Sequence, residues 1–166
     1  MAVYFLDTSA LVKRYALEDG TRWIQSVTDP AAGNLIYVGR ITGAEVVAAI
    51  RRKVRNGETT ETNARAVTED FRFDFASQYQ IIEINDVVVD RAMLLIENHK
   101  LRGYDGVQLA AAIEINDQLL AVGMPMTGVT ALTMISADVD LNAAAAAEGL
   151  VVESPKSHPH PDDKTP

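Results

Sequence analysis

Five acidic residues occupy positions where a carboxylate could do chemistry: Asp7, Glu45, Asp105, Asp138 and Asp140. Asp7 ends a short apolar run of strand-forming residues, Glu45 comes shortly after a second such run, and Asp138 and Asp140 follow a later one. Ligands of open parallel sheets bind beyond the carboxyl ends of the strands, which places these four acids together. Asp105 follows a helical turn instead, so this rule does not place it. Converging carboxylates need a cation, and Mg²⁺ or Mn²⁺ is the natural one.

Each of these acids also has an ordinary structural explanation. Asp7 can cap the helix that follows it, and Glu45 stands three residues after Thr42, the spacing of a capping box. The other three acids can be first-turn residues that interact favourably with a helix dipole. Taken singly these explanations are the better ones, so the metal-site hypothesis depends on the combination of acids.

The elements that must position these acids alternate along the chain. Runs rich in strand-forming residues predict strands at 2–6, 35–38, 80–84 and 131–135, and a last short one at 150–152. Apolar residues at helical spacing and capping signals predict helices between them. Such alternation implies right-handed crossovers between parallel strands. We therefore expect an α/β fold with a small parallel sheet of four to five strands and helices on both faces.

The chain divides into one predicted domain, residues 1–153, and a tail, residues 154–166. The tail holds four of the six prolines and no apolar side chain, a composition that predicts disorder. A loop is expected at 123–129. No stretch approaches the roughly 18 apolar residues that span a bilayer, and an aspartate at position seven argues against a signal peptide. The expected location is the cytoplasm, without membrane association.

Composition narrows the chemistry further. The 166 residues include no cysteine, which excludes disulfides, zinc–thiolate sites and cysteine nucleophiles. With 15 basic and 23 acidic residues the formal net charge is −8, which by itself argues against a nucleic-acid partner. The charges are segregated, however. Residues 103–153 contain no Lys, Arg or His, whereas Arg51, Arg52, Lys53 and Arg55 fall within five positions.

Other phosphate-handling sites are missing from the sequence. It contains neither the Gly-x-x-x-x-Gly-Lys-Ser/Thr pattern of a nucleotide P-loop nor the Gly-x-Gly-x-x-Gly pattern of a dinucleotide site. A phosphoaspartate receiver domain would need paired acids at the first strand and a late lysine, and no lysine lies between Lys100 and Lys156. A Ser-His-Asp hydrolase is also a poor match, since His99 lies late in a predicted helix and the other two histidines are in the tail.

Four blocks of sequence resemble one known family. They are residues 6–15 (LDTSALVKRY), 42–49 (TGAEVVAA), 101–110 (LRGYDGVQLA) and 136–141 (SADVDL). In this order and at these spacings they resemble the PIN-domain ribonucleases, in particular the VapC-type toxins of bacterial and archaeal toxin–antitoxin pairs. The resemblance extends over about residues 3 to 152.

The resemblance implies a metal-binding quartet of acids, Asp7, Glu45, Asp105 and Asp138, with Asp140 as an additional or substitute acid. It further implies that Thr8 or Ser9 hydrogen-bonds a metal-bound water. The implied assembly is a homodimer, inhibited by a cognate VapB-like antitoxin whose tail covers the acidic cleft.

The implied activity is that of a Mg²⁺- or Mn²⁺-dependent endoribonuclease acting as a toxin. The cations would lower the pKa of a bound water, and the resulting hydroxide would attack an RNA phosphodiester in line, so that no side chain serves as nucleophile. A PIN-type nuclease in RNA processing outside a toxin–antitoxin pair is the nearest alternative. A catalytically inactive PIN-fold interaction module is another.

The basic cluster, Arg51, Arg52, Lys53 and Arg55, follows Glu45 on the same predicted helix. Residues seven apart fall near one helix face, about 10 Å along the axis, which places Arg52 on the Glu45 side. We expect the cluster to hold RNA phosphates or the acidic part of an antitoxin. A solvated helix end, whose cations suit the C-terminal dipole, is the alternative.

Overall fold

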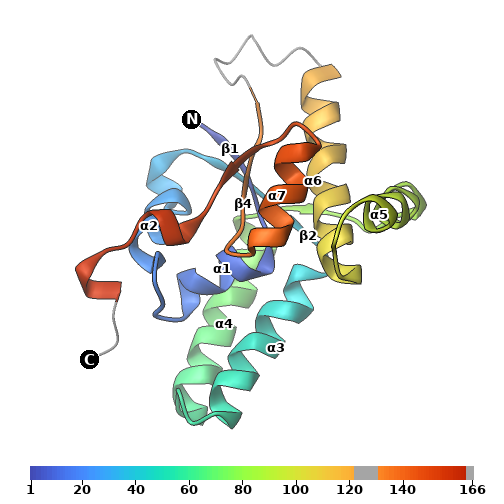
Figure 1. The fold of residues 1–166 in the computed structure, drawn as a ribbon. Coiled ribbons are helices and arrows are strands. Elements are labelled where there is room, and N and C mark those ends of the chain that lie inside the picture. Colours follow the sequence, from blue (N-terminus) through green and yellow to red (C-terminus); the bar gives the residue numbers. More distant parts are fainter. Residues whose placement is uncertain (122–130, 164–166) are drawn as a thin grey trace.

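A five-stranded parallel sheet forms the centre of the computed structural model, which describes residues 1–121 and 131–163 (Figure 1). The strands are β1 (Val3–Leu6), β2 (Leu35–Gly39), β3 (Gln80–Ile82), β4 (Thr133–Ile135) and β5 (Val151–Glu153). Their order across the sheet is β3-β2-β1-β4-β5, and every neighbouring pair is parallel. The predicted α/β class, parallel sheet and strand number are confirmed.

Helices cover both faces of this sheet, as expected. They are α1 (Thr8–Tyr15), α2 (Thr21–Val27), α3 (Thr42–Arg55), α4 (Glu61–Ser77), α5 (Asp86–Asn98), α6 (Gly103–Ala121) and α7 (Val139–Ala147). Four of them begin at a side chain that accepts an N–H three residues on, namely at Asp7, Thr60, Asn85 and Asp138. The cap explanation is thus correct for Asp7, and Asp138 proves to be an N-cap instead of the expected first-turn residue.

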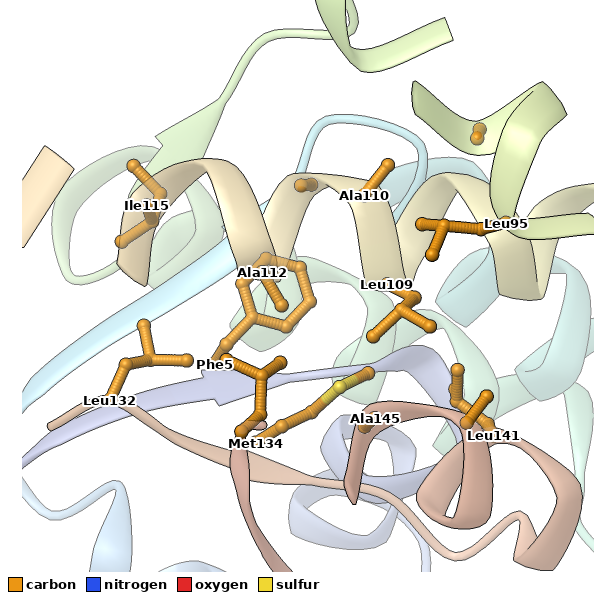
Figure 2. Close-up of a cluster of buried hydrophobic side chains, with 14 of the residues drawn as sticks. Phe5, Leu95, Leu109, Ala110, Ala112, Ile115, Leu132, Met134, Leu141 and Ala145 are labelled. Carbon is orange, nitrogen blue, oxygen red and sulfur yellow. The ribbon is translucent and has the colours of Figure 1, made fainter. Parts of the chain in front are cut away.

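Two apolar layers hold the helices to the sheet, because side chains of a strand point alternately to its two faces. Val3 and Phe5 of β1 face α5, α6 and α7, whereas Leu6 faces the side of α1 to α4. Figure 2 shows the first layer, in which Phe5 and Met134 of the sheet pack beneath Leu109 of α6. The central strands are buried on both faces, so the edge where they end is held rigidly.

The C-terminal segment differs from its predicted disorder as far as Asp163. Residues Pro155–Ser157 and Pro161–Asp163 form two short 3₁₀ helices beside α2 (Figure 1). Buried Asp163 accepts hydrogen bonds from the backbone N–H groups of Gly20 and Arg22. Composition missed this attachment because it is polar: the segment supplies an acceptor for helix N–H groups that lack intrahelical partners. Residues 164–166 lie outside the described residues.

Two further expectations concern the remaining chain. The predicted loop at 123–129 lies outside the described residues. Within the residues that are described, no helix combines the length and the apolar composition needed to cross a membrane.

Candidate active site

Four acids from four separate segments line one cavity of about 480 Å³ at the carboxyl edge of the sheet: Asp7, Glu45, Asp105 and Asp138. Asp7 directly follows β1, and Asp138 begins α7 just after β4. Glu45 lies in the first turn of α3, which follows β2, and Asp105 lies in the first turn of α6. The structure therefore brings together the quartet, including the one acid that the strand rule does not place.

Asp7 is the buried member of this set. Its Oδ1 accepts the Ser9 hydroxyl at 2.9 Å and the Ala10 N–H at 3.0 Å. Burial raises the pKa of Asp7 to about 6, although these hydrogen bonds lower it. The protein thus holds a carboxylate whose negative charge is only partly compensated, an environment that a cation would stabilise.

Glu45 is held from two sides. Its Oε2 accepts the Thr8 hydroxyl at 2.5 Å and the Gln108 side-chain N–H at 3.0 Å. The capping box with Thr42 is wrong, because Thr42 is already the first residue of α3. The N-cap is Ile41, and no side chain caps the helix. The Glu45 carboxylate instead points across to α1 and α6, which is where the cavity lies.

The hydroxyls of Thr8 and Ser9 both donate to acids of the cavity. Thr8 donates to Glu45, and Ser9 donates to Asp7 while accepting the Ala137 N–H at 2.8 Å. Ser9 therefore ties Asp7 to the turn that carries Asp138. In this structure the two hydroxyls position carboxylates; their contact with a metal-bound water stays a prediction.

Asp105 and Asp138 are electrostatically coupled. Burial raises the pKa of Asp105, the Arg102 N–H lowers it, and the charges of Asp138 and Asp140 raise it further. Asp138 accepts the Leu141 N–H at 3.0 Å through Oδ1. Repulsion between these acids is again the situation in which a bound cation lowers the energy.

Asp140 is placed apart from the quartet. Its side chain is 59% exposed and lies 3.5 Å from the Lys100 ammonium, and it is outside the lining of the cavity. Its charge still reaches Asp105. Of the five acids, Asp140 is the one whose role as metal ligand has least support from the geometry.

The donor set fits a hard divalent cation, since every side chain of the quartet offers carboxylate oxygen. In the described part of the chain, however, no three acidic or histidine side chains converge closely enough to form a metal cluster as they stand. Mg²⁺ commonly binds through one or two carboxylates and keeps several waters. The cavity suits that mode, with the remaining acids acting through water.

The basic cluster divides into two pairs. Arg52 and Arg55 line the cavity beside the acids, and for Arg52 this is what its spacing of seven residues from Glu45 predicts. Arg51 instead pairs with Glu61 at 2.8 Å. Lys53 pairs with Glu18 at 2.6 Å and with Glu58 at 3.2 Å. Helix geometry thus turns Arg51 and Lys53 to other faces of α3, where they pair with acids of this chain. Their contact with RNA or an antitoxin stays a prediction that the cavity does not support.

Three further residues with polar side chains, which sequence reasoning missed, line the cavity: Arg102, Tyr104 and Gln108. Tyr104 is 60% exposed, so its ring is accessible at the rim. The available signal is their position, since all three lie within three residues of Asp105. A side chain one helical turn from a site residue shares its face of the helix.

The fold and the cavity define the class of protein: a parallel α/β domain with an acidic site at the carboxyl edge of its sheet. The model of the PIN domain family matches residues 4–123. Two Mycobacterium tuberculosis proteins, ribonuclease VapC45 of strain CDC 1551 / Oshkosh and ribonuclease VapC49 of strain ATCC 25618 / H37Rv, are each 31% identical to this chain over 124 residues. The match covers 75% of this chain and 84% of each relative.

A solved structure shows the same architecture. The toxin–antitoxin complex from Klebsiella pneumoniae contains a chain that superposes with a TM-score of 0.58 at 18% sequence identity, covering 92% of this chain and 97% of that one. This chain belongs to the PIN domain family and is a relative of the VapC ribonucleases.

Proposed function

We propose that this protein is an endoribonuclease that hydrolyses RNA phosphodiester bonds with Mg²⁺ or Mn²⁺ and acts as the toxin of a toxin–antitoxin pair. The observation that carries the proposal is the cavity itself, which four carboxylates from separate segments line together with three arginines. The names of the two 31% identical relatives, both ribonucleases, support the same reaction.

The position of each residue in the cavity indicates its role in the proposed reaction. Asp7, Asp105 and Asp138 would hold the cation, directly or through water, and Glu45 would act on it from the α3 side of the cavity. When bound, the divalent cation neutralises the carboxylates and activates water for in-line attack on phosphorus. Arg52 would hold the phosphates that flank the cut site, since a guanidinium binds phosphate through paired hydrogen bonds. Local cations let a chain of net charge −8 bind RNA over a small footprint.

The proposed partners follow from the same cavity. RNA and the acidic part of a VapB-like antitoxin both offer anionic groups to Arg52 and Arg55, so an antitoxin segment placed there would compete with RNA. The Klebsiella pneumoniae structure is itself described as a toxin–antitoxin complex. We further propose a homodimer in the cytoplasm.

Two alternatives differ in what they predict. A PIN nuclease of RNA processing would have the same cavity but no antitoxin encoded beside it. An inactive interaction module would not need the acids, yet the whole quartet is present and lines one cavity. The retained acids favour an enzyme.

The direct test is RNA cleavage by the purified protein with Mn²⁺ or Mg²⁺. Asp105→Asn should abolish cleavage, because a neutral amide replaces a carboxylate of the cavity, and EDTA should do the same to the wild type. Asp162→Asn is the matched control, since Asp162 is an exposed acid of the C-terminal segment. Equal cleavage by wild type and Asp105→Asn would overturn the proposed activity.

The toxin role needs a test in cells. Induced expression should arrest growth, Asp105→Asn should not, and co-expression of a small protein encoded beside the gene should restore growth. RNA cleavage in vitro without growth arrest would favour the RNA-processing alternative.

A further inference from the structure

Gln108 is a buried polar side chain at the floor of the acidic cavity. It lies in α6, three residues after Asp105 and so on the same face of the helix, and it is 3% exposed. Its neighbours along α6, Leu109 to Ala112, pack in the apolar core. A carboxamide is costly to bury unless it is hydrogen-bonded, so its partners indicate why it is there.

The Gln108 amide nitrogen faces three oxygens. They are the Thr42 hydroxyl at 2.8 Å, the Glu45 Oε2 at 3.0 Å and the Thr8 hydroxyl at 3.2 Å. The orientation of the amide is fixed by chemistry, because the opposite one would place its carbonyl oxygen against the Glu45 carboxylate, which has no proton to donate. Gln108 is therefore a donor toward Glu45.

The other end of the carboxamide is unsatisfied. Gln108 Oε1 is buried and accepts no hydrogen bond from the described residues. The chain makes room for it with Gly39, the last residue of β2, where an added Cβ would lie 3.1 Å from this oxygen. A side chain chosen for stability alone would not leave a buried acceptor unpaired. Compared with an apolar side chain at this position, the Gln108 carboxamide adds a hydrogen bond to Glu45.

Among the described residues, only one of the two Glu45 carboxylate oxygens accepts hydrogen bonds. Thr8 and Gln108 both donate to Oε2, while no described residue donates to Oε1. Two donors from different helices, α1 and α6, restrain the carboxylate more firmly than one could. Its second oxygen is thereby left to act inside the cavity.

We propose that Gln108 is a positioning residue, which together with Thr8 holds the Glu45 carboxylate so that its Oε1 serves the cation and the RNA in the cavity. The proposal rests on the proposed function, and the loss of Gln108 acts through Glu45. Groups that orient metal-site residues from behind usually change metal affinity by about 10- to 100-fold when removed.

The test uses Gln108→Met, which keeps the length of the side chain and removes both polar atoms. We expect Mn²⁺ affinity, measured by isothermal titration calorimetry, to fall about 10-fold, and RNA cleavage to fall with it. The melting temperature should be unchanged or higher, since an unpaired buried oxygen is lost. Gln118→Met is the matched control: Gln118 lies on the exposed side of the same helix and hydrogen-bonds Glu114, away from the cavity.

A double-mutant cycle distinguishes positioning from a general packing role. In a Glu45→Gln background, Gln108→Met should have little further effect on Mn²⁺ affinity, because its target is already neutral. Additive losses would overturn the proposal, as would wild-type Mn²⁺ affinity in Gln108→Met. Thr8→Val removes the other donor and should weaken Mn²⁺ binding similarly, which keeps the test open if Gln108→Met does not fold.

The outcomes also separate this proposal from the proposed function. If the wild type cleaves no RNA but Gln108→Met still lowers Mn²⁺ affinity through Glu45, the nuclease activity fails and the positioning role stands. If Gln108→Met retains full Mn²⁺ affinity and cleavage, the positioning role fails and the nuclease activity stands. A wild type that binds no Mn²⁺ would overturn both.

Discussion

Two aspartates are buried in this fold, Asp7 in the acidic cavity and Asp163 in the C-terminal segment, and their hydrogen bonding and pKa shifts differ. Asp163 accepts N–H groups on both oxygens, from Arg22 on Oδ1 and from Gly20 and His160 on Oδ2. Asp7 accepts the Ser9 hydroxyl and the Ala10 N–H, both on Oδ1. Burial disfavours both charges, but the three N–H groups outweigh it and lower the pKa of Asp163, whereas the pKa of Asp7 rises to about 6.

Asp163 is thus a carboxylate whose charged form stabilises the fold, whereas the charged form of Asp7 destabilises it. A fully hydrogen-bonded buried carboxylate is paired like any structural polar group. A buried carboxylate with a raised pKa is typical of functional sites. Glu45 and Asp138 each accept protein hydrogen bonds on one oxygen.

The largest expected effect comes from Asp7→Asn, which should lower RNA cleavage by about 100-fold or more, because a neutral amide binds a divalent cation far more weakly than a carboxylate does. The same substitution should increase the stability of the fold at neutral pH. The pKa of Asp7 is higher in the folded than in the unfolded chain, so its contribution to stability is present at low pH and lost as the pH rises through about 6. That loss is at most about 3 kcal/mol at pH 7.

Denaturant unfolding in EDTA checks this prediction, with the pH varied from 4 to about 8. Wild type should lose stability across that range, and Asp7→Asn should lose less. A variant that is both inactive and less stable at pH 7 would show that Asp7 is structural, like Asp163.

The second effect concerns the cations near each region. Arg52→Ala should weaken RNA binding about 5-fold and reduce its salt dependence by about one phosphate contact, because Arg52 lines the cavity. Arg22→Ala is the matched change near the C-terminal segment, where Arg22 lies 3.8 Å from Asp162, and it should leave RNA binding unchanged. Fluorescence anisotropy with labelled RNA at several salt concentrations measures both. If both variants lost RNA affinity equally, the net charge of the protein and not the position of Arg52 would explain the binding.

The third effect is a loss of stability without a loss of activity. Asp163→Ala should destabilise the fold by about 1 kcal/mol, the usual cost of removing a helix cap, since the N–H groups of Gly20 and Arg22 lose their acceptor. RNA cleavage should stay at the wild-type level. Thermal unfolding and a cleavage assay on the same preparation check both parts. Reduced cleavage by a folded Asp163→Ala variant would contradict a purely structural role of Asp163.

The pH dependence of this attachment has the opposite sign to that of Asp7. The folded pKa of Asp163 is lowered, so its contribution is present above the unfolded value of about 3.9 and is lost as the pH falls through the folded pKa. Amide hydrogen exchange at Gly20 and Arg22 should therefore stay slow near neutral pH. Fast exchange there at pH 7 would contradict the attachment.

The smallest effect is at the stack between Trp23 and His158, whose ring centroids lie 4.0 Å apart with nearly parallel planes. His158→Ala should cost roughly 0.5 kcal/mol and leave cleavage unchanged. Trp23 fluorescence should report the change directly. An unchanged emission spectrum would indicate that the stack does not form in solution.

Much of this architecture follows from local pattern. The alternation of strand and helix predicted the parallel sheet, since only helical crossovers join its strands, and the strands lie at the expected positions. The edge rule then predicted that Asp7, Glu45, Asp138 and Asp140 lie together, and the first three do line one cavity whereas Asp140 lies outside it. Asp105 needed the resemblance to the PIN-domain ribonucleases, because no strand precedes its helix.

Other features depend on side-chain direction across elements. Helical spacing separates Arg52 from Arg51 and Lys53, yet only the folded chain shows that Glu61 and Glu18 occupy the other faces. Gln108 looked like any helical glutamine, because its partners Thr8, Thr42 and Glu45 are distant in sequence. Tertiary hydrogen bonds leave no periodic signal.

The sequence by itself determined the class of fold and the identity of the acids, because strand and helix patterns are local and parallel strands end at a common edge. The tertiary structure decided the state of each acid. Burial and the number of N–H and hydroxyl donors around a carboxylate depend on segments far apart in the chain. Those donors make Asp163 a helix cap across 143 residues of sequence, whereas they do not offset the burial of Asp7, whose pKa is raised inside the cavity.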